Sequence, residues 1–323
     1  MSRAIADPFP VTFRAFAEDQ PGDQWLAHFG RHWPALRSVL DSLAPRQLSA
    51  MGDAEVALRL RMPELVPAWE RLSKLVDDPV AARVLTLADT MAPSGGCSQA
   101  VVDGVLVRNY EYTPAQFEAT IWKSSLTGRR VIGVTAGLWG LLDGMNDAGL
   151  AVSGAFGGRL LNGPGFAIPL IVRYLLEVCS TVEDVEQQLP TLSPTEACNL
   201  TVADRSASAS FFLTPGERPR RAPEVAVTNH QDVLAWTHFA ELSDTVARQR
   251  LLALLVRTEP ADEVIGALLR PPLFRTDYAE QFGTLYTAAY RPDGIAEYRW
   301  LGQHWRQSFD DFHPGERQIL YAN

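Results

Sequence analysis

The feature that most constrains this fold is the dipeptide Asp103-Gly104, which lies between two β-prone stretches, residues 97–102 and 105–112. An Asp-Gly pair in this setting is a strong signal for a two-residue β-hairpin. The short loop fixes the register of the two strands, and side chains alternate between the faces of the ribbon. The pattern therefore predicts that Cys97 and Arg108 share one face and lie diagonally opposite each other.

The same register pairs Cys97 with Tyr110 and Gln99 with Arg108. A guanidinium beside a thiol favours the thiolate, which is the nucleophilic form of cysteine. The thiol also follows Gly95-Gly96, a flexible step at which the backbone can bend or be cut. These residues predict a reactive cysteine at the start of a strand.

Two short motifs carry a resemblance to a known family. Gly96-Cys97-Ser98 is followed by Arg108-Asn109-Tyr110-Glu111, with an acid three residues after the arginine. This arrangement resembles the cysteine N-terminal-nucleophile (Ntn) hydrolases, and among them the acyl-CoA:isopenicillin N (6-aminopenicillanic acid) acyltransferase-like proteins, which are related to choloylglycine hydrolases, penicillin V acylases and acid ceramidase. The resemblance covers about residues 90–323. It implies an α+β fold, a four-layer αββα sandwich of two antiparallel sheets, preceded by a helical N-terminal segment.

In that family the precursor cuts itself before the cysteine. The resemblance thus implies a helical propeptide-like segment, residues 1–96, which becomes the small chain, and a catalytic core, residues 97–323. Apolar residues recur at helical spacing between Trp25 and Leu43, and further helices are expected near residues 54–75 and 79–90.

After residue 96 the pattern changes from helical to strand-rich. In chain order we expect a strand pair at 131–142 and 150–156, a helix at 169–188, a hairpin at 197–214, a helix at 243–256, helical residues near 260–270, and a hairpin at 283–300. The stretch 138–153 also resembles the family's G-x-N-x-x-G-L hairpin.

The resemblance implies roles for the residues around the cysteine. The freed Cys97 would attack with its sulfur and use its own α-amine as the base, and Arg108 would hold both in place. Asn199, at the start of a strand, is the expected oxyanion donor, the alternative being a strand-edge asparagine satisfied by backbone. Glu111 stands where the family usually has Asp, and it reaches the site only if its strand bends, because it lies on the opposite face from Arg108.

Four further positions follow from the resemblance. Arg248 or Arg250 matches the family's arginine in an S-x-x-R-type segment, and the spacing leaves both open, as it leaves open a solvated helix face. His230 ends a Thr-Asn-His signature and is expected to bind substrate, or to be an ordinary partly buried histidine. Phe156 stands where choloylglycine hydrolases have a second oxyanion asparagine, and this departure argues against assigning bile-salt or penicillin V specificity to the chain. A backbone N–H near Gly157 can substitute.

Composition narrows the class of protein. The net charge of −9 and the pI near 5.2 argue against nucleic-acid binding. Three cysteines make no disulfide framework, the N-terminus lacks an apolar signal-type core, and the longest apolar run is too short to span a membrane. His28 and His32 lie four residues apart, but no third ligand is evident, so we favour a surface or packing role. We expect a cytoplasmic protein without a metal or another cofactor.

Three functions fit these features. The first is a self-processing amidase, made as a zymogen, that hydrolyses a small N-acyl substrate. The second is an acyltransferase that moves an acyl group from a CoA thioester to an amine. The third is a non-catalytic binding protein on the same scaffold. The sequence shows no defensible acyl-CoA site, so the amidase is favoured. The expected partner is a small-molecule N-acyl or acyl-thioester substrate. The sequence does not decide whether the protein forms a homo-oligomer.

Overall fold

The computed structural model describes residues 8–42, 51–88, 95–280 and 282–322. The strands are β1 (Phe9–Ala17), β2 (Gly96–Val102), β3 (Val105–Tyr112), β4 (Thr120–Ser124), β5 (Val131–Ala136), β6 (Gly140–Asn146), β7 (Ala151–Phe156), β8 (Cys198–Ala203), β9 (Ser208–Leu213), β10 (Arg220–Arg221), β11 (Gly283–Arg291), β12 (Ile295–Trp300), β13 (Gln303–Ser308) and β14 (Gly315–Tyr321). The helices are α1 (Asp23–Ser42), α2 (Met51–Arg61), α3 (Val66–Val76), α4 (Pro79–Val84), α5 (Ile168–Val178), α6 (Val182–Gln188), α7 (Thr237–Leu242), α8 (Thr245–Thr258) and α9 (Ala261–Leu268).

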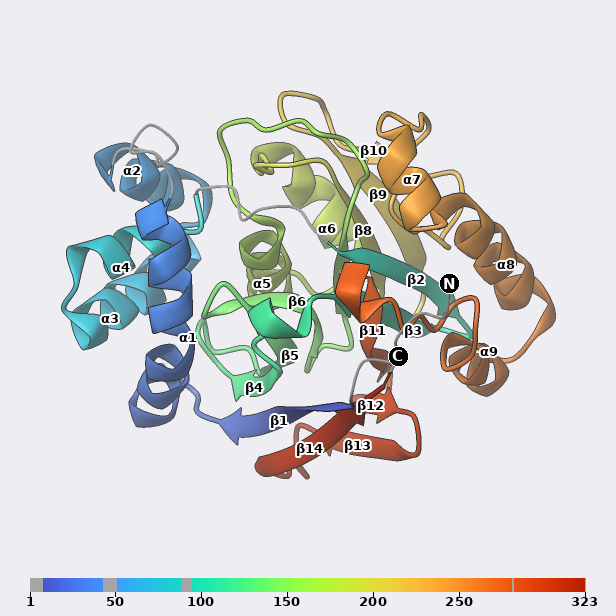
Figure 1. The fold of residues 1–323 in the computed structure, drawn as a ribbon. Coiled ribbons are helices and arrows are strands. Elements are labelled where there is room, and N and C mark those ends of the chain that lie inside the picture. Colours follow the sequence, from blue (N-terminus) through green and yellow to red (C-terminus); the bar gives the residue numbers. More distant parts are fainter. Residues whose placement is uncertain (1–7, 43–50, 89–94, 281, 323) are drawn as a thin grey trace.

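The strands form two sheets that face each other (Figure 1). One has nine strands in the order β10-β9-β8-β7-β6-β5-β4-β1-β14, and the other has five in the order β13-β12-β11-β3-β2. Helix α5 packs on the outer face of the larger sheet, and α8 and α9 pack on the smaller one, while β2 and β3 contact β7 and β8 across the middle. The result is the expected four-layer α+β sandwich.

The predicted hairpin is confirmed. Strands β2 and β3 pair with Cys97 opposite Tyr110 and Gln99 opposite Arg108. Both loop residues, Asp103 and Gly104, have positive φ (51° and 75°), as a type I′ hairpin turn requires.

The segment before Cys97 is helical, as expected, but it also supplies a strand that its apolar spacing did not predict. Strand β1 lies between β4 and β14 in the larger sheet and is parallel to β4, whereas the other described strand pairs are antiparallel. The indole N–H of Trp122 donates to the carbonyl of Glu18, and that of Trp25 donates to the carbonyl of Leu138. The segment is therefore built into the sandwich.

Three expected elements are divided in the structure. Residues 131–142 are not one strand, because the chain reverses at Gly137-Leu138, where both φ angles are positive, and forms the β5–β6 hairpin. The helix expected at 169–188 ends at Val178 and begins again after Thr181, which makes a capping box. The helix expected at 54–75 is interrupted at Pro63. In each case local turn or cap chemistry overrides apolar spacing.

None of the described helices combines the length and the apolar character needed to cross a bilayer.

Candidate active site

Cys97 lies at the start of β2 and is 5% exposed. Its sulfur accepts a hydrogen bond from Arg108 Nη2 at 3.0 Å, and Arg108 is completely buried. Burial raises the pKa of the Cys97 thiol to about 11, although the Arg108 charge lowers it. In the uncut chain the thiol is therefore protonated near neutral pH and needs a base before it can attack.

The far side of the Arg108 guanidinium is occupied by a carboxylate. Nη1 donates to Asp143 Oδ2 at 2.7 Å and to the Leu142 carbonyl at 3.1 Å. The hydroxyls of Tyr286 and Tyr290 also donate to Asp143. A buried ion pair needs such additional partners to offset its desolvation. We refer to Arg108, Asp143, Tyr286 and Tyr290 as the sulfur-side cluster.

A second set of buried groups holds the backbone nitrogen of Cys97. This N–H donates to Asn229 Oδ1 at 2.7 Å, and the same oxygen accepts from Arg248 Nη2 at 3.0 Å. Arg248 Nη1 donates in turn to Glu111 Oε2 and to Ser98 Oγ, both at 2.8 Å. We refer to Ser98, Glu111, Asn229 and Arg248 as the nitrogen-side cluster; all four are fully buried.

Glu111 joins this cluster on the face of the ribbon opposite Arg108. Strands β2 and β3 pair in unbroken register with Glu111 opposite Gly96, whereas the register between β3 and β11 shifts between Thr284, opposite Glu111, and Tyr286, opposite Tyr110. A Cβ on Gly96 would lie 2.7 Å from Glu111 Oε2 and 3.3 Å from Arg248 Nη2. The absent side chain of Gly96 is what leaves room for the carboxylate. Gly95 has φ of +97°, and its Cβ would lie 2.2 Å from the Glu111 carbonyl oxygen, so a side chain at either position needs the site to shift.

Asn199 supports the site in a different way from the expected one. Its Nδ2 donates to the carbonyls of Thr228 at 2.8 Å and His230 at 2.9 Å. Its buried Oδ1 has no hydrogen-bond partner among the described residues. Neither amide hydrogen is free to stabilise an oxyanion in this arrangement. Asn199 instead fixes the short segment that carries Asn229.

The structure separates the two candidate arginines, because Arg248 is buried in the nitrogen-side cluster and Arg250 is exposed. His230 is half-buried, with Nδ1 3.0 Å from Thr245 Oγ1, and burial lowers its pKa. Gly157 donates its backbone N–H to the Ala197 carbonyl at 2.8 Å, so this donor too is occupied.

Phe156 borders the nitrogen-side cluster. Its carbonyl accepts from Asn229 Nδ2 at 3.0 Å. Its ring packs edge-on against Phe239 and Trp236, with centroid distances of 5.2 and 6.4 Å. Asn229 therefore links the Cys97 nitrogen to Phe156, whose ring belongs to an apolar cluster with Trp236 and Phe239.

Sequence reasoning missed Asn229 and Asp143. Asn229 is the middle residue of the Thr-Asn-His signature, of which only the histidine was selected. Asp143 stands in the strand Gly140–Asn146 between apolar neighbours, and an acid in a buried strand was the available signal. The other two cysteines, Cys179 and Cys198, are buried, and burial raises the pKa of both thiols.

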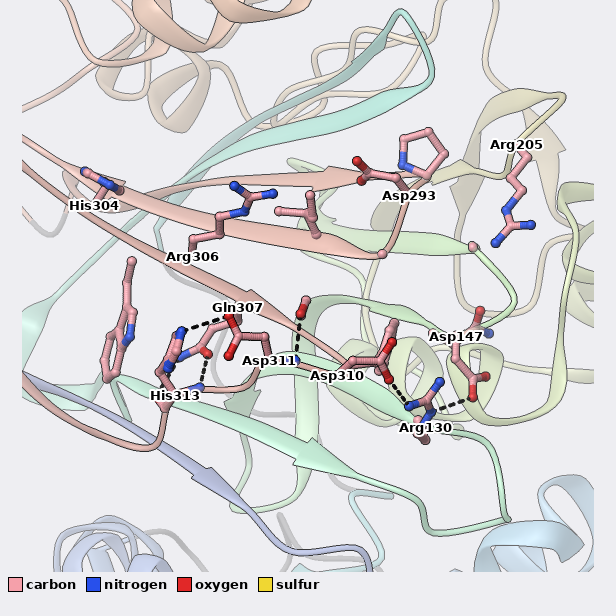
Figure 2. A pocket seen from close by; sticks show the side chains of 18 of the residues that line it. Arg130, Asp147, Arg205, Asp293, His304, Arg306, Gln307, Asp310, Asp311 and His313 are labelled. Carbon is pink, nitrogen blue, oxygen red and sulfur yellow. Dashed lines mark hydrogen bonds and ion pairs between the residues drawn. The ribbon is translucent and has the colours of Figure 1, made fainter.

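A polar hollow of about 700 Å³ lies elsewhere (Figure 2). Charged side chains line it, among them Arg130, which binds Asp147 and Asp310. It includes Pro292, which lies next to Gly104 at the tip of the β2–β3 hairpin, whereas Cys97 is at the other end of β2. None of the residues predicted for the site lines this hollow.

His28, for which we expected a surface or a packing role, is buried, with Nε2 3.2 Å from Glu118 Oε2. The described part of the chain contains no group of three or more histidine, cysteine, aspartate or glutamate side chains placed to bind a metal.

Residues 98–304, more than half of the chain, match the protein family described as acyl-coenzyme A:6-aminopenicillanic acid acyl-transferase. A search of curated proteins finds no match.

Similar solved structures include a mutant of conjugated bile acid hydrolase from Clostridium perfringens (TM-score 0.45, 13% identity, 70% of this chain and 96% of that chain covered). They also include penicillin V acylase from Agrobacterium tumefaciens (0.46, 13%, 69% and 90%) and the Caenorhabditis elegans ortholog of N-acylethanolamine-hydrolyzing acid amidase (0.44, 14%, 69% and 99%).

Proposed function

The chain belongs to the acyl-coenzyme A:6-aminopenicillanic acid acyl-transferase family, and we propose that it is a self-processing cysteine amidohydrolase acting on a small N-acyl substrate. One observation carries this proposal: the sulfur and the nitrogen of a single residue, Cys97, are each held by a separate buried polar cluster. A cysteine that only fills the core needs neither cluster, and Cys179 and Cys198 are placed in that way.

Processing begins with attack of the Cys97 sulfur on the Gly96 carbonyl carbon. The peptide C–N bond breaks, the acyl group moves from nitrogen to sulfur, and the Cys97 nitrogen becomes an α-amine. Water then hydrolyses the thioester, which leaves a carboxylate on Gly96 and a free thiol on Cys97.

Turnover uses the same two atoms of Cys97. An α-amine titrates near ~8 and a thiol near ~8.5 in ordinary surroundings, so the amine can take the thiol proton close to neutral pH. The sulfur attacks the substrate carbonyl, the substrate amine leaves with a proton, and water releases the acid from the acyl-enzyme. Asn229 Nδ2 donates one of its hydrogens to the Phe156 carbonyl. The described residues supply no acceptor for the other hydrogen, which we assign to the oxyanion.

The two clusters divide the remaining work. Arg108 touches the sulfur and stabilises the thiolate. Arg248 and Glu111 act on the nitrogen through Asn229, which they orient. After cleavage the amine gains hydrogens, and Glu111 Oε1, buried without a hydrogen-bond partner among the described residues, is an available acceptor beside Gly96.

An acyltransferase is the second candidate, favoured by the description of the family. It would share the acyl-enzyme on Cys97, with an amine in place of water as acceptor. Supplying an acyl-thioester or an N-acyl substrate, with and without an added amine, and measuring free acid against new amide by mass spectrometry separates the two reactions.

Intact mass and N-terminal sequencing of the purified chain test the proposal. We expect a chain that begins Cys97-Ser98-Gln99-Ala100 in the wild type and one uncut chain in Cys97→Ala. An active protein that stays in one piece would overturn self-processing, and an uncut Cys97 that also resists iodoacetamide would support the non-catalytic binding protein.

A further inference from the structure

The acid that pairs with Arg108 is unusually well supplied with hydrogen-bond donors. Asp143 Oδ2 accepts from Arg108 and from the Tyr286 hydroxyl, and Oδ1 accepts from the Tyr290 hydroxyl. All four residues are completely buried. Burial and the nearby Asp143 charge raise the pKa of both tyrosines, so each remains a proton donor.

The Arg108 guanidinium thus donates hydrogen bonds to two groups, the Asp143 carboxylate and the Cys97 sulfur. Arg108 Nη1 faces Asp143 at 2.7 Å, and Nη2 faces the Cys97 sulfur at 3.0 Å. Little solvent is present to screen these charges, so the negative charge of Asp143 weakens the field that Arg108 exerts on the sulfur. Each hydroxyl that donates to the carboxylate disperses part of that negative charge.

We propose that Tyr286 and Tyr290 are positioning residues that hold Asp143 and set how much of the Arg108 charge acts on the Cys97 sulfur. This inference rests on the proposed role of Cys97 as the nucleophile. It assigns a function to two tyrosines of β11 that are 189 and 193 residues from Cys97 in the chain and whose hydroxyls donate to Asp143.

The other charged or titratable groups around the thiol are the same in the wild type and in every variant. After processing they include the Cys97 α-amine, which titrates near ~8 in ordinary surroundings, so all chains are compared in the same processing state, established by intact mass. Glu111 and Arg248 compensate each other on the opposite face of the ribbon. The Tyr110 ring lies under the Arg108 guanidinium, 5.0 Å from it. Tyr298 has its hydroxyl 3.4 Å from that of Tyr290, and burial and the Asp143 charge raise its pKa.

The experiment measures the rate of Cys97 alkylation by iodoacetamide against pH in the full chain as purified, with the Cys97 peptide quantified by mass spectrometry. The midpoint of this rate–pH curve reports the pKa of the Cys97 thiol. Tyr286→Phe and Tyr290→Phe should each move the midpoint upward by roughly 0.5–1 pH unit, which corresponds to a fraction of the free energy of a hydrogen bond to a charged group. Asp143→Asn should move it downward, because the competing negative charge is gone.

Tyr278→Phe is the matched control. It also removes one buried tyrosine hydrogen bond, to the Thr284 carbonyl at 3.0 Å, but the Tyr278 hydroxyl makes no contact with Asp143. Its midpoint should equal that of the wild type. Circular dichroism melts establish that each variant is folded, and opposite shifts in Tyr286→Phe and Asp143→Asn are not expected from a loss of packing.

Two outcomes are distinguishable. If wild-type Cys97 is not alkylated from pH 6 to 10, the proposed function and this inference both fail. If Cys97 is reactive but the tyrosine variants and Asp143→Asn have the wild-type midpoint, or shift in the same direction, only the inference fails. Should Asp143→Asn not fold, the two tyrosine variants measured against Tyr278→Phe decide it.

Discussion

The two faces of the β2–β3 ribbon each carry a buried arginine–carboxylate pair, but the two pairs act on different atoms of Cys97. Each buries one arginine paired with one carboxylate: Arg108 with Asp143 on the sulfur side, and Arg248 with Glu111 on the nitrogen side. Arg108 touches the sulfur directly. Arg248 reaches the nitrogen only through the side-chain oxygen of Asn229.

The difference follows from the atom that each cluster serves. A thiolate carries a full charge, which a cation stabilises by direct contact. The Cys97 nitrogen must serve first as a peptide N–H and then as a basic amine. A cation in direct contact would repel the protonated amine and weaken it as a base, whereas the oxygen of Asn229 accepts a hydrogen bond in either state.

The largest effect is expected where the two clusters meet. Cys97→Ala should remain uncut and inactive, because it removes the nucleophile of both reactions. Cys179→Ala and Cys198→Ala should keep most of the activity, since their thiols lie in the core cluster away from the site. Amidase activity that survives in Cys97→Ala would show that Cys97 is not the nucleophile, and the two clusters would then have no catalytic role to compare.

Asn229→Ala should break the nitrogen side. It removes the acceptor of the Cys97 N–H and a candidate oxyanion donor, so kcat should fall by roughly 10²–10³ with little change in KM. Asn199→Ala should cost mainly stability, about 1–3 kcal/mol for the carbonyls of Thr228 and His230 left unpaired. Steady-state kinetics and urea unfolding measure both. If Asn199→Ala lowers kcat as strongly at unchanged stability, the oxyanion role first expected for Asn199 is correct.

Paired double variants compare the two clusters at constant net charge. Arg108→Met with Asp143→Asn should slow alkylation of Cys97 roughly tenfold at pH 8, as for a thiol pKa raised by one unit. Arg248→Met with Glu111→Gln should leave it within about twofold, because that pair has no direct contact with the sulfur. In the fraction of wild-type chains that remains uncut, whose thiol pKa is about 11, the alkylation rate should rise about tenfold per pH unit from 7 to 10. If both double variants slowed alkylation equally, the assignment of one cluster to the sulfur and the other to the nitrogen would be wrong.

The smallest effect should come from Gly96→Ala. The added Cβ displaces the Glu111 carboxylate by a fraction of an ångström, so we expect processing to slow by roughly several-fold, as for a small misplacement of catalytic groups. Gly30→Ala is the control, because its Cβ would meet no atom within 4 Å beyond its chain neighbours and the backbone of its own helix. The fraction of cut chain against time measures both. Wild-type processing in Gly96→Ala would show that Glu111 does not need this space.

Much of the sulfur side was predictable because it depends on local geometry. An Asp-Gly loop sets the register, the register sets the parity, and parity places Cys97 beside Arg108. The expected helices and strands were right where they are short and bounded by strong turns. They were wrong in extent near Gly137 and Thr181, where a local reversal or cap interrupts an apolar run.

By itself the sequence determined the hairpin, the cysteine beside its arginine, the family and the four-layer class. Only the tertiary structure decided which groups complete the two clusters. Asp143 is 35 residues from Arg108, Asn229 is 132 from Cys97, and Arg248 is 137 from Glu111. Local periodicity does not predict which residues pair over such separations. A buried charge must be paired, but the packing of sheets and helices decides which residue lies next to it. For the same reason Asn199, a candidate donor in sequence, proved to be bound to backbone carbonyls, while its neighbour in space, Asn229, contacts the nucleophile.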